Sequence, residues 1–147
     1  MSDIHFVDTT LRDGNQSLWA LNMPIAAMLP IAEQIDNAGF EGAEFFISVM
    51  FKKYANERKE NAWDWLRLGT KKFTRTRLRY QGGMHSAFEK TPDCILKRQI
   101  ERLVAYGITL TRTSNSWNDF EAFKADELDP LKAIGMDAVA NLIYTST

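Results

Sequence analysis

Short apolar runs rich in β-branched and aromatic residues alternate along the chain with longer stretches of helical periodicity. The apolar runs start 30 to 38 residues apart, which leaves room for one helix between consecutive strands. Strands and helices that alternate in this way favour βαβ units around a parallel sheet. The sequence therefore predicts an α/β fold with strands at residues 4–8, 42–47, 77–81, 108–112 and 138–144.

Four helices are predicted from apolar residues that recur at intervals of three and four positions. Three of them end next to a glycine, the residue that most easily takes the left-handed conformation after a last helical turn. Pro130 is expected to interrupt the last helix, because proline lacks the N–H that an interior turn needs. The helices are predicted before Gly39, over residues 61–73, from Thr91 to Gly107, and from Asn118 or Asp119 to Gly135.

Length and composition narrow the class of protein. The chain has 147 residues, 45% hydrophobic and 25% charged, which fits one globular domain over residues 1–147 rather than a disordered chain. The net charge of -1 gives no general attraction to nucleic acid or to anionic lipid. One cysteine excludes an internal disulfide framework and a cysteine-based zinc site. The sequence has no apolar run of about 18 residues and no signal peptide, so we expect no nucleic-acid or membrane partner and a cytoplasmic protein.

The segment DTTLRDGNQS, residues 8–17, follows the first predicted strand and is the densest group of chemically active side chains. In parallel α/β folds, ligands bind at the carboxyl ends of the strands. Arg12 offers a planar set of donors to a carboxylate or to the oxygen of an enolate. Asp13 suits a divalent metal, and Gln16 can both donate and accept a hydrogen bond. A polar loop with a local Arg–Asp pair explains the same residues, so composition alone leaves the function open.

The segment from Asp8 to Leu18 resembles the signature of the DRE-TIM metallolyase superfamily, the HMG-CoA-lyase-like barrels. Within it, the chain is most similar to the carboxyltransferase branch, which includes the carboxyltransferase domain of pyruvate carboxylase, the transcarboxylase 5S subunit and the oxaloacetate decarboxylase α subunit. The resemblance covers essentially the whole chain. It extends through Met28-Leu-Pro-Ile-Ala-Glu, Gly39-Phe40, Glu44, Trp63-Asp-Trp-Leu-Arg, Asn118-Asp119 and Tyr144-Thr-Ser.

The resemblance implies a TIM (βα)8 barrel, of which this chain would form (βα)4 plus a fifth strand, or half the barrel. A complete barrel needs about 250 residues. A flavodoxin-like, doubly wound five-stranded sheet is the alternative, because five strands are enough to form one. A half-barrel leaves two edge strands with unpaired backbone groups. We therefore expect either a homodimer or a missing C-terminal half.

The resemblance also implies a metal-dependent lyase or carboxyltransferase that acts on a small 2-oxo acid or acyl substrate through an enolate. The cofactor of the complete family member would be a divalent metal, Mn, Mg, Zn or Co. Arg12 and Glu44 would be catalytic, with Glu44 orienting Arg12, while Gln16 would bind substrate and Asp13 would bind the metal. If the chain keeps this geometry, Arg12 lies within hydrogen-bond range of Asp13 or Glu44.

Other features of the sequence depart from the family pattern. The family's His-x-His metal ligands and the metal-bound lysine of the carboxyltransferase branch are both missing. Tyr80-Gln81-Gly82 stands where the branch has an Arg-Gly pair that grips the substrate carboxylate, and His85 nearby has no partner histidine. We therefore expect no turnover by this chain alone, which can also be without a bound metal. The alternative to an enzyme is a truncated or engineered half-barrel fragment with no catalytic activity.

Overall fold

The structure is a computed structural model that describes residues 4–84 and 91–144. Its contacts cluster into two compact units, residues 1–79 and 80–147, which are described one at a time below. The expectation of a single domain over residues 1–147 stays a prediction.

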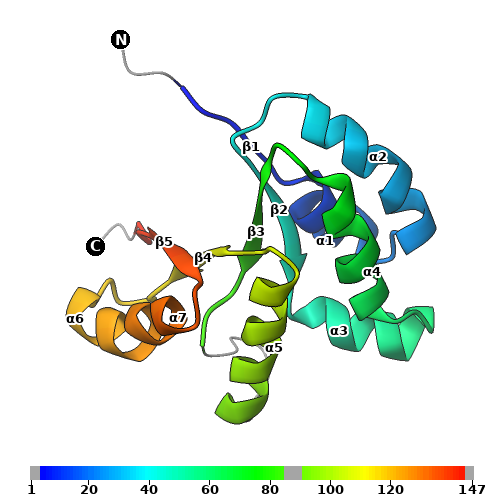
Figure 1. The fold of residues 1–147 in the computed structure, drawn as a ribbon. Helices are drawn as coiled ribbons and strands as arrows, with labels where there is room; N and C mark the ends of the chain where they lie inside the picture. Colours follow the sequence, from blue (N-terminus) through cyan, green and yellow to red (C-terminus); the bar gives the residue numbers. More distant parts are fainter. Residues whose placement is uncertain (1–3, 85–90, 145–147) are drawn as a thin grey trace. The chain divides into compact units, whose positions relative to one another are not determined.

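The described residues form a five-stranded sheet in which the strands are hydrogen bonded in the order β1-β2-β3-β4-β5 (Figure 1). The pairs β1–β2 and β4–β5 are parallel. A flavodoxin-like sheet would instead have the order 2-1-3-4-5. Sequential order is what successive βα units of a barrel produce, so the half-barrel is confirmed and the doubly wound alternative is not needed. The strands are β1 (Val7–Asp8), β2 (Gly42–Ile47), β3 (Arg77–Gln81), β4 (Leu110–Ser114) and β5 (Asp137–Asn141).

Two strands have the predicted bounds and three do not. β2 and β3 match the sequence-based ranges, whereas β1 begins three residues late because its register with β2 starts at Val7. Phe6, before that point, is 67% exposed. In the second unit, the β4–β5 register starts at Leu110 and Asp137. β4 therefore lies two residues further toward the C-terminus than predicted, and β5 ends at Asn141 instead of the predicted Tyr144.

In the first unit, helices α2 (Ile25–Asn37) and α4 (Ala62–Gly69) pack against each other. α4 also packs on β2, whose six residues are all buried. Trp65 of α4 stacks on Phe45 of β2 with ring centroids 4.3 Å apart and donates its indole N–H to the Phe45 carbonyl. A Cβ at Gly69 would overlap both rings, so only glycine fits at that position of α4. The predicted helix over residues 61–73 is confirmed, with its last turn formed by η3 (Thr70–Lys72).

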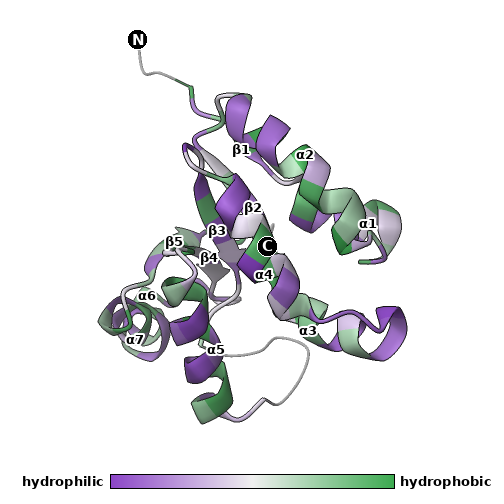
Figure 2. Ribbon diagram, turned by 45° about the vertical axis from the view of Figure 1, so that its right-hand side comes forward, coloured by the Kyte–Doolittle hydropathy of each residue, from purple (hydrophilic) through white to green (hydrophobic). Residues whose placement is uncertain are grey.

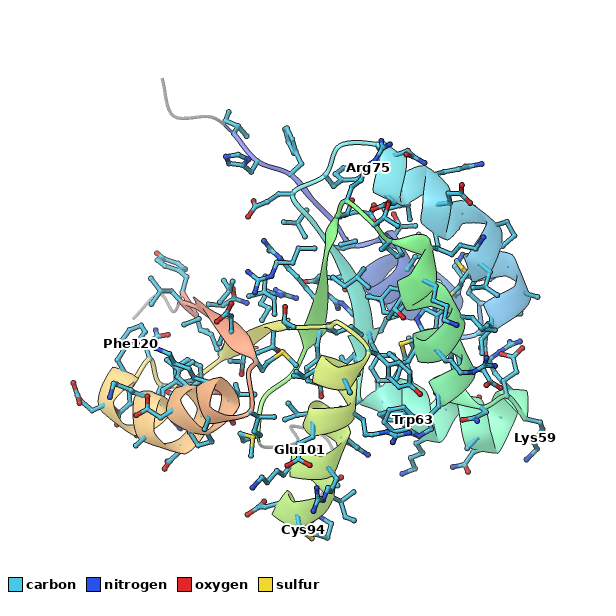
Figure 3. All side chains as sticks on the ribbon, viewed as in Figure 1. Lys59, Trp63, Arg75, Cys94, Glu101 and Phe120 are labelled. Carbon is cyan, nitrogen blue, oxygen red and sulfur yellow. The ribbon has the colours of Figure 1, made fainter. Side chains whose placement is uncertain are left out.

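Short helical segments after β1 and β2 were not predicted from the sequence. The first consists of η1 (Thr10–Gly14) and α1 (Asn15–Trp19), and the second of α3 (Val49–Lys53) and η2 (Tyr54–Arg58). Each piece is five residues long, which is too short to show a helical period. The second segment packs on α4 through Phe51 and Trp63, whose ring centroids are 4.6 Å apart. Trp63 is labelled in Figure 3.

The second unit contains α5 (Asp93–Ala105) and a helix of three successive pieces before β5. Leu96, Ile100 and Leu103 form the buried face of α5, which Figure 2 shows beside a hydrophilic face. This helix consists of α6 (Phe120–Phe123), η4 (Lys124–Leu128) and α7 (Asp129–Ala133). Pro130 lies in the first turn of α7, and the backbone is helical on both sides of the η4–α7 junction, so Pro130 marks a change from π- to α-helix and does not end the helix. Within the described ranges, no helix has both the length and the apolar character to cross a membrane.

Candidate functional site

The segment that follows β1 is closed into a tight π-helical turn by its own backbone. The Asp8 carboxylate accepts hydrogen bonds from the Thr10 N–H (3.1 Å) and the Thr10 hydroxyl (2.8 Å). The Thr9 carbonyl accepts three further N–H groups, from Arg12 (3.3 Å), Asp13 (2.7 Å) and Gly14 (3.0 Å). These bonds fold η1 directly onto the carboxyl end of β1. The turn therefore holds the side chains of the signature segment at the end of the strand where ligands bind in parallel folds.

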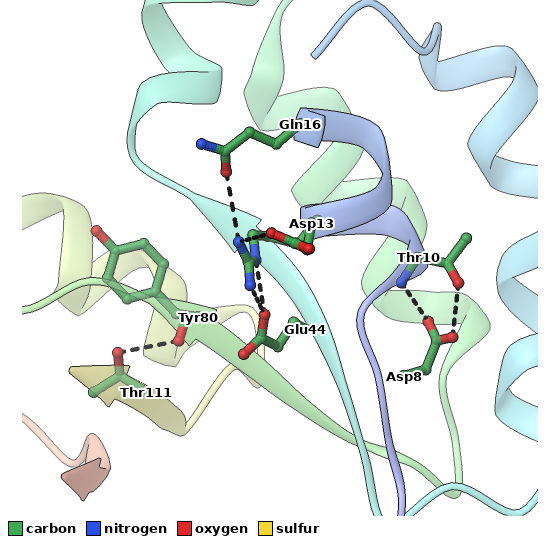
Figure 4. Close-up of polar contacts among 8 residues, drawn as sticks. Asp8, Thr10, Asp13, Gln16, Glu44, Tyr80 and Thr111 are labelled. Carbon is green, nitrogen blue, oxygen red and sulfur yellow. Dashed lines mark hydrogen bonds and ion pairs between the residues drawn. The ribbon is translucent and has the colours of Figure 1, made fainter. Parts of the chain in front are cut away.

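Arg12 contacts the other three predicted site residues and is 5% exposed. Figure 4 shows the side chains of Asp13, Gln16 and Glu44 around the guanidinium that the dashed lines join. Its Nε donates to Glu44 Oε2 on β2 at 2.7 Å, and its Nη2 donates to the same oxygen. Its Nη1 donates to Asp13 Oδ1 at 2.9 Å and lies 3.5 Å from Gln16 Oε1. The predicted contact between Arg12 and the two acids is confirmed, and all four predicted site residues come together in the first unit.

The two carboxylates around Arg12 differ in exposure: Glu44 is a buried partner that holds the guanidinium, whereas Asp13 is accessible to a ligand. The Glu44 side chain is 4% exposed, so its charge is held between β2 and the guanidinium. The Asp13 side chain is 51% exposed. The contacts of Arg12 account for four of the five N–H groups of a guanidinium. The Nη1 side, with its partly exposed partners, is the one at which an oxygen of a ligand could replace Asp13 or Gln16.

The divalent-metal site implied by the resemblance does not fit the residues that the structure describes. Among residues 4–84 and 91–144, no three His, Cys, Asp or Glu side chains group as metal ligands. Asp13 is paired with Arg12, and one carboxylate is far from the six or more oxygen ligands that hard cations take, part of them from water. The four site residues alone therefore make a cation–carboxylate site rather than a metal centre.

We expect added Mn²⁺ at about 1 mM to leave the melting temperature of this chain unchanged, because a ligand stabilises a fold only when its concentration exceeds its Kd. Electron paramagnetic resonance of free Mn²⁺ in the same titration measures binding directly. The Asp13→Ala variant is the control. Stoichiometric Mn²⁺ that is lost in Asp13→Ala would contradict this expectation and would mean that a second copy, or residues outside the described ranges, supply the other ligands.

In the second unit, the end of β3 is held by side chains from β4 and η4. The Thr111 hydroxyl lies 3.1 Å from the Tyr80 carbonyl, and the Glu127 carboxylate accepts the Met84 N–H. Gln81 ends β3, and its Oε1 is buried without a hydrogen-bond partner in the described residues. His85, the candidate ligand in the loop after β3, lies outside the described residues.

Sequence reasoning missed two buried polar residues beside the site. Asn15 follows Gly14 in the turn, and Tyr54 lies in η2; both side chains are completely buried. Asn15 stands inside the signature segment, so its position was visible in the sequence, but nothing in the residue pattern indicated that it points inward. The Tyr54 hydroxyl meets the backbone of Met23, 31 residues away, a contact that only the folded chain shows.

Comparisons with known proteins point to one group. No protein-family model matches the chain. A pyruvate carboxylase subunit of Methanocaldococcus jannaschii is 29% identical over 144 residues, which are 97% of this chain and 25% of the relative. The 2-oxoglutarate carboxylase large subunit of Hydrogenobacter thermophilus is 27% identical over 97% of this chain and 22% of its own length. The chain thus spans about a quarter of the length of these curated relatives.

The fold is shared with a solved structure of the same group. The carboxyl transferase domain of Rhizobium etli pyruvate carboxylase, solved with oxamate and biotin, superposes with a TM-score of 0.83 at 24% identity. The match covers 97% of this chain and 25% of that one. Together, the relatives and this fold confirm the resemblance of the chain to the carboxyltransferase branch of the DRE-TIM metallolyase superfamily.

Proposed function

We propose that this chain contributes the Arg12 edge of a site for carboxyl transfer to or from a 2-oxo acid. The observation that carries the proposal is the buried Arg12 guanidinium, fixed by Glu44 on one side and open to partly exposed partners on the other. The similar proteins from M. jannaschii and H. thermophilus are carboxylases of pyruvate and of 2-oxoglutarate, and both names support a 2-oxo acid as substrate.

The chemistry follows from where negative charge develops. When a carboxyl group leaves the carbon next to a carbonyl, the electron pair of the broken bond moves onto the carbonyl oxygen and an enolate forms. In the opposite direction, that carbon loses a proton to a base to give the same enolate, which then bonds to the incoming carboxyl group. A guanidinium that is already oriented stabilises that charge without having to reorganise during the reaction. Glu44 supplies the orientation, because two N–H groups of Arg12 are bonded to one of its oxygens. Gln16, whose Oε1 lies 3.5 Å from Nη1, would bind the substrate there.

Asp13 has a separate part in the proposal. As a metal ligand it would supply one oxygen, and the other ligands would come from outside the described residues.

A partner for the outer strands belongs to the same proposal. β1 and β5 are the first and last strands of the described sheet, and each has one neighbouring strand in it. Exposed strand edges invite pairing with another chain. We propose that a second copy, or the remainder of a longer protein such as the relatives are, covers these edges. The homodimer stays a prediction.

Binding of oxalate tests the proposed function without requiring turnover. Oxalate is a planar dianion that resembles the enolate of pyruvate, and we expect it to bind with a Kd of about 1 mM, as suits a few hydrogen bonds in a partly open site. Arg12→Lys should weaken binding at least about tenfold, because an ammonium group cannot replace the planar fork of donors. The measurement is a nuclear magnetic resonance titration of the backbone amide signals of residues 13–16, which the parent protein and Arg12→Lys both have.

The matched control is Arg67→Lys, which makes the same change at an exposed arginine on α4 that pairs with Asp64 at 3.2 Å. It should bind oxalate as the parent protein does. Equal affinities in the parent protein and Arg12→Lys would reject Arg12 as the ligand-binding cation.

A further inference from the structure

Asn15 lies within the turn that carries the site residues, but its side chain is used for internal contacts. It is completely buried, whereas Asp13 and Gln16 on either side of it are partly exposed. Its Oδ1 accepts the Met23 N–H at 3.1 Å, and its backbone carbonyl accepts the Leu21 N–H at 2.8 Å. Asn15 therefore joins the site turn to the loop that follows α1.

That loop has a backbone conformation that needs support. Ala20 and Leu21 have φ angles of +48° and +60°, in the left-handed region that residues with a Cβ rarely adopt. Two such residues in succession persist only where surrounding contacts hold them. Three of these contacts go to Asn15, from the N–H groups of Ala20, Leu21 and Met23. The Asn22 N–H also donates to the Trp19 carbonyl at 2.8 Å, and the Arg58 guanidinium donates to the Asn22 carbonyl.

Tyr54 supports the loop from the opposite side. Its hydroxyl donates to the Met23 carbonyl at 3.3 Å, so the Met23 peptide groups are held by Asn15 at the N–H and by Tyr54 at the carbonyl. Burial is the main cause that raises the pKa of Tyr54 to about 12, and the hydroxyl therefore stays protonated and able to donate at neutral pH. The Asn15 amide and the Tyr54 hydroxyl each also lie 3.7 Å from the Met28 sulfur.

We propose that Asn15 is a positioning residue for Arg12. By fixing the η1–α1 turn to Met23, it keeps the Arg12 guanidinium on Glu44 and keeps its Nη1 beside Gln16. Asn15 is close to the site in sequence but touches no group of the site through its side chain, so it acts through the turn. The consequence for ligand binding rests on the proposed function, whereas the effect on the Arg12 geometry does not.

The experiment compares three variants of the whole chain. Asn15→Ala removes the amide, and Tyr54→Phe removes only the hydroxyl at the other side of Met23 while keeping the ring that packs in the core. Asp36→Asn is the control for lost stability, because Asp36 bonds to residues 74–76 and not to the site turn. The readouts are the Arg12 Nε–H chemical shift and the Kd of oxalate, taken at a temperature where circular dichroism shows every variant folded.

In Asn15→Ala, we expect the Arg12 Nε–H signal to move toward the position of a free arginine and the Kd of oxalate to rise at least about tenfold, since misplacement by about 1 Å is costly to a bound geometry. Tyr54→Phe should shift the signal in the same direction by less, and it decides the matter if Asn15→Ala does not fold. Asp36→Asn should change neither readout.

An Arg12 signal that stays in place in both Asn15→Ala and Tyr54→Phe would overturn the proposal. If the parent protein binds no oxalate, the proposed function fails and the Arg12 signal alone still tests Asn15.

Discussion

Glu44→Ala is expected to lower the free energy of unfolding by about 3–5 kcal/mol, because it leaves the charge of Arg12 buried without its counter-charge. Arg12 and Glu44 are 5% and 3% exposed, so water cannot replace the lost carboxylate. The other carboxylate beside Arg12, that of Asp13, is half-exposed and bonds only to Nη1, so it does not replace the buried Glu44 at Nε and Nη2. The measurement is the midpoint of urea unfolding. If the slope of unfolding free energy against urea concentration stays constant, a shift of the midpoint reports a change in stability alone.

A double variant distinguishes two free energies: the destabilisation caused by an unpaired buried charge, and the net stabilisation that the Arg12–Glu44 pair gives to the fold. Replacing a buried ion pair by apolar residues of similar volume is often neutral or stabilising. Arg12→Met combined with Glu44→Leu should therefore recover most of the stability that Glu44→Ala loses. In free-energy terms, the two sites are strongly coupled, as expected for residues in direct contact.

Glu41→Ala is the matched control, three residues earlier in the chain. Glu41 also pairs with an arginine, Arg79 at 3.4 Å, but its side chain is 50% exposed. An exposed pair of this kind contributes about 1 kcal/mol or less. Equal losses in Glu44→Ala and Glu41→Ala would show that burial does not strengthen the dependence of Arg12 on Glu44.

The sequence predicted best the parts of the fold that consist of continuous apolar runs. β2 is buried at every position and has the predicted bounds. The pairing of Arg12 with Glu44, 32 residues apart, was expected from the resemblance to a family and not from spacing. The choice between a barrel and a doubly wound sheet needed the observed strand order, because both folds use the same alternation of strands and helices.

What the sequence did not predict depends on contacts between distant segments. The buried Asn15 amide accepts the N–H of Met23, which follows the left-handed residues Ala20 and Leu21. No local pattern in the sequence indicates that the chain turns back to make this contact. The five-residue helical pieces after β1 and β2 are too short to have a period. Asp36 is an example in α2: at the level of sequence it is one polar residue near a helix end, with nothing to single it out.

In the structure, Asp36 is a buried carboxylate that fixes the end of α2 to the loop before β3. Its Oδ1 accepts the backbone N–H groups of Arg75 (3.0 Å) and Thr76 (2.8 Å). Its Oδ2 accepts the backbone N–H and the hydroxyl of Thr74 (2.9 and 3.0 Å). Burial by itself would raise the pKa of Asp36, but these hydrogen bonds to the charged form outweigh it and lower the pKa to about 2.

Asp36→Asn is expected to cost roughly 2–3 kcal/mol at neutral pH, since a pKa lowered from 3.8 to about 2 corresponds to that much stabilisation of the folded chain. The stabilisation is present above the unfolded pKa near 3.8 and is lost as the pH falls toward 2, where the folded chain also takes up the proton. Other carboxyl groups titrate in the same range, so the informative quantity is the difference in unfolding free energy between the parent protein and Asp36→Asn. Urea midpoints at about pH 7 and about pH 2.5 should show that difference shrinking markedly at the lower pH.

Asp64→Asn, at an exposed carboxylate on α4, serves as the control and should differ little from the parent protein at either pH. A loss in Asp36→Asn that is the same at both pH values would mean that the carboxylate contributes by its shape and hydrogen bonds alone, and not by its charge.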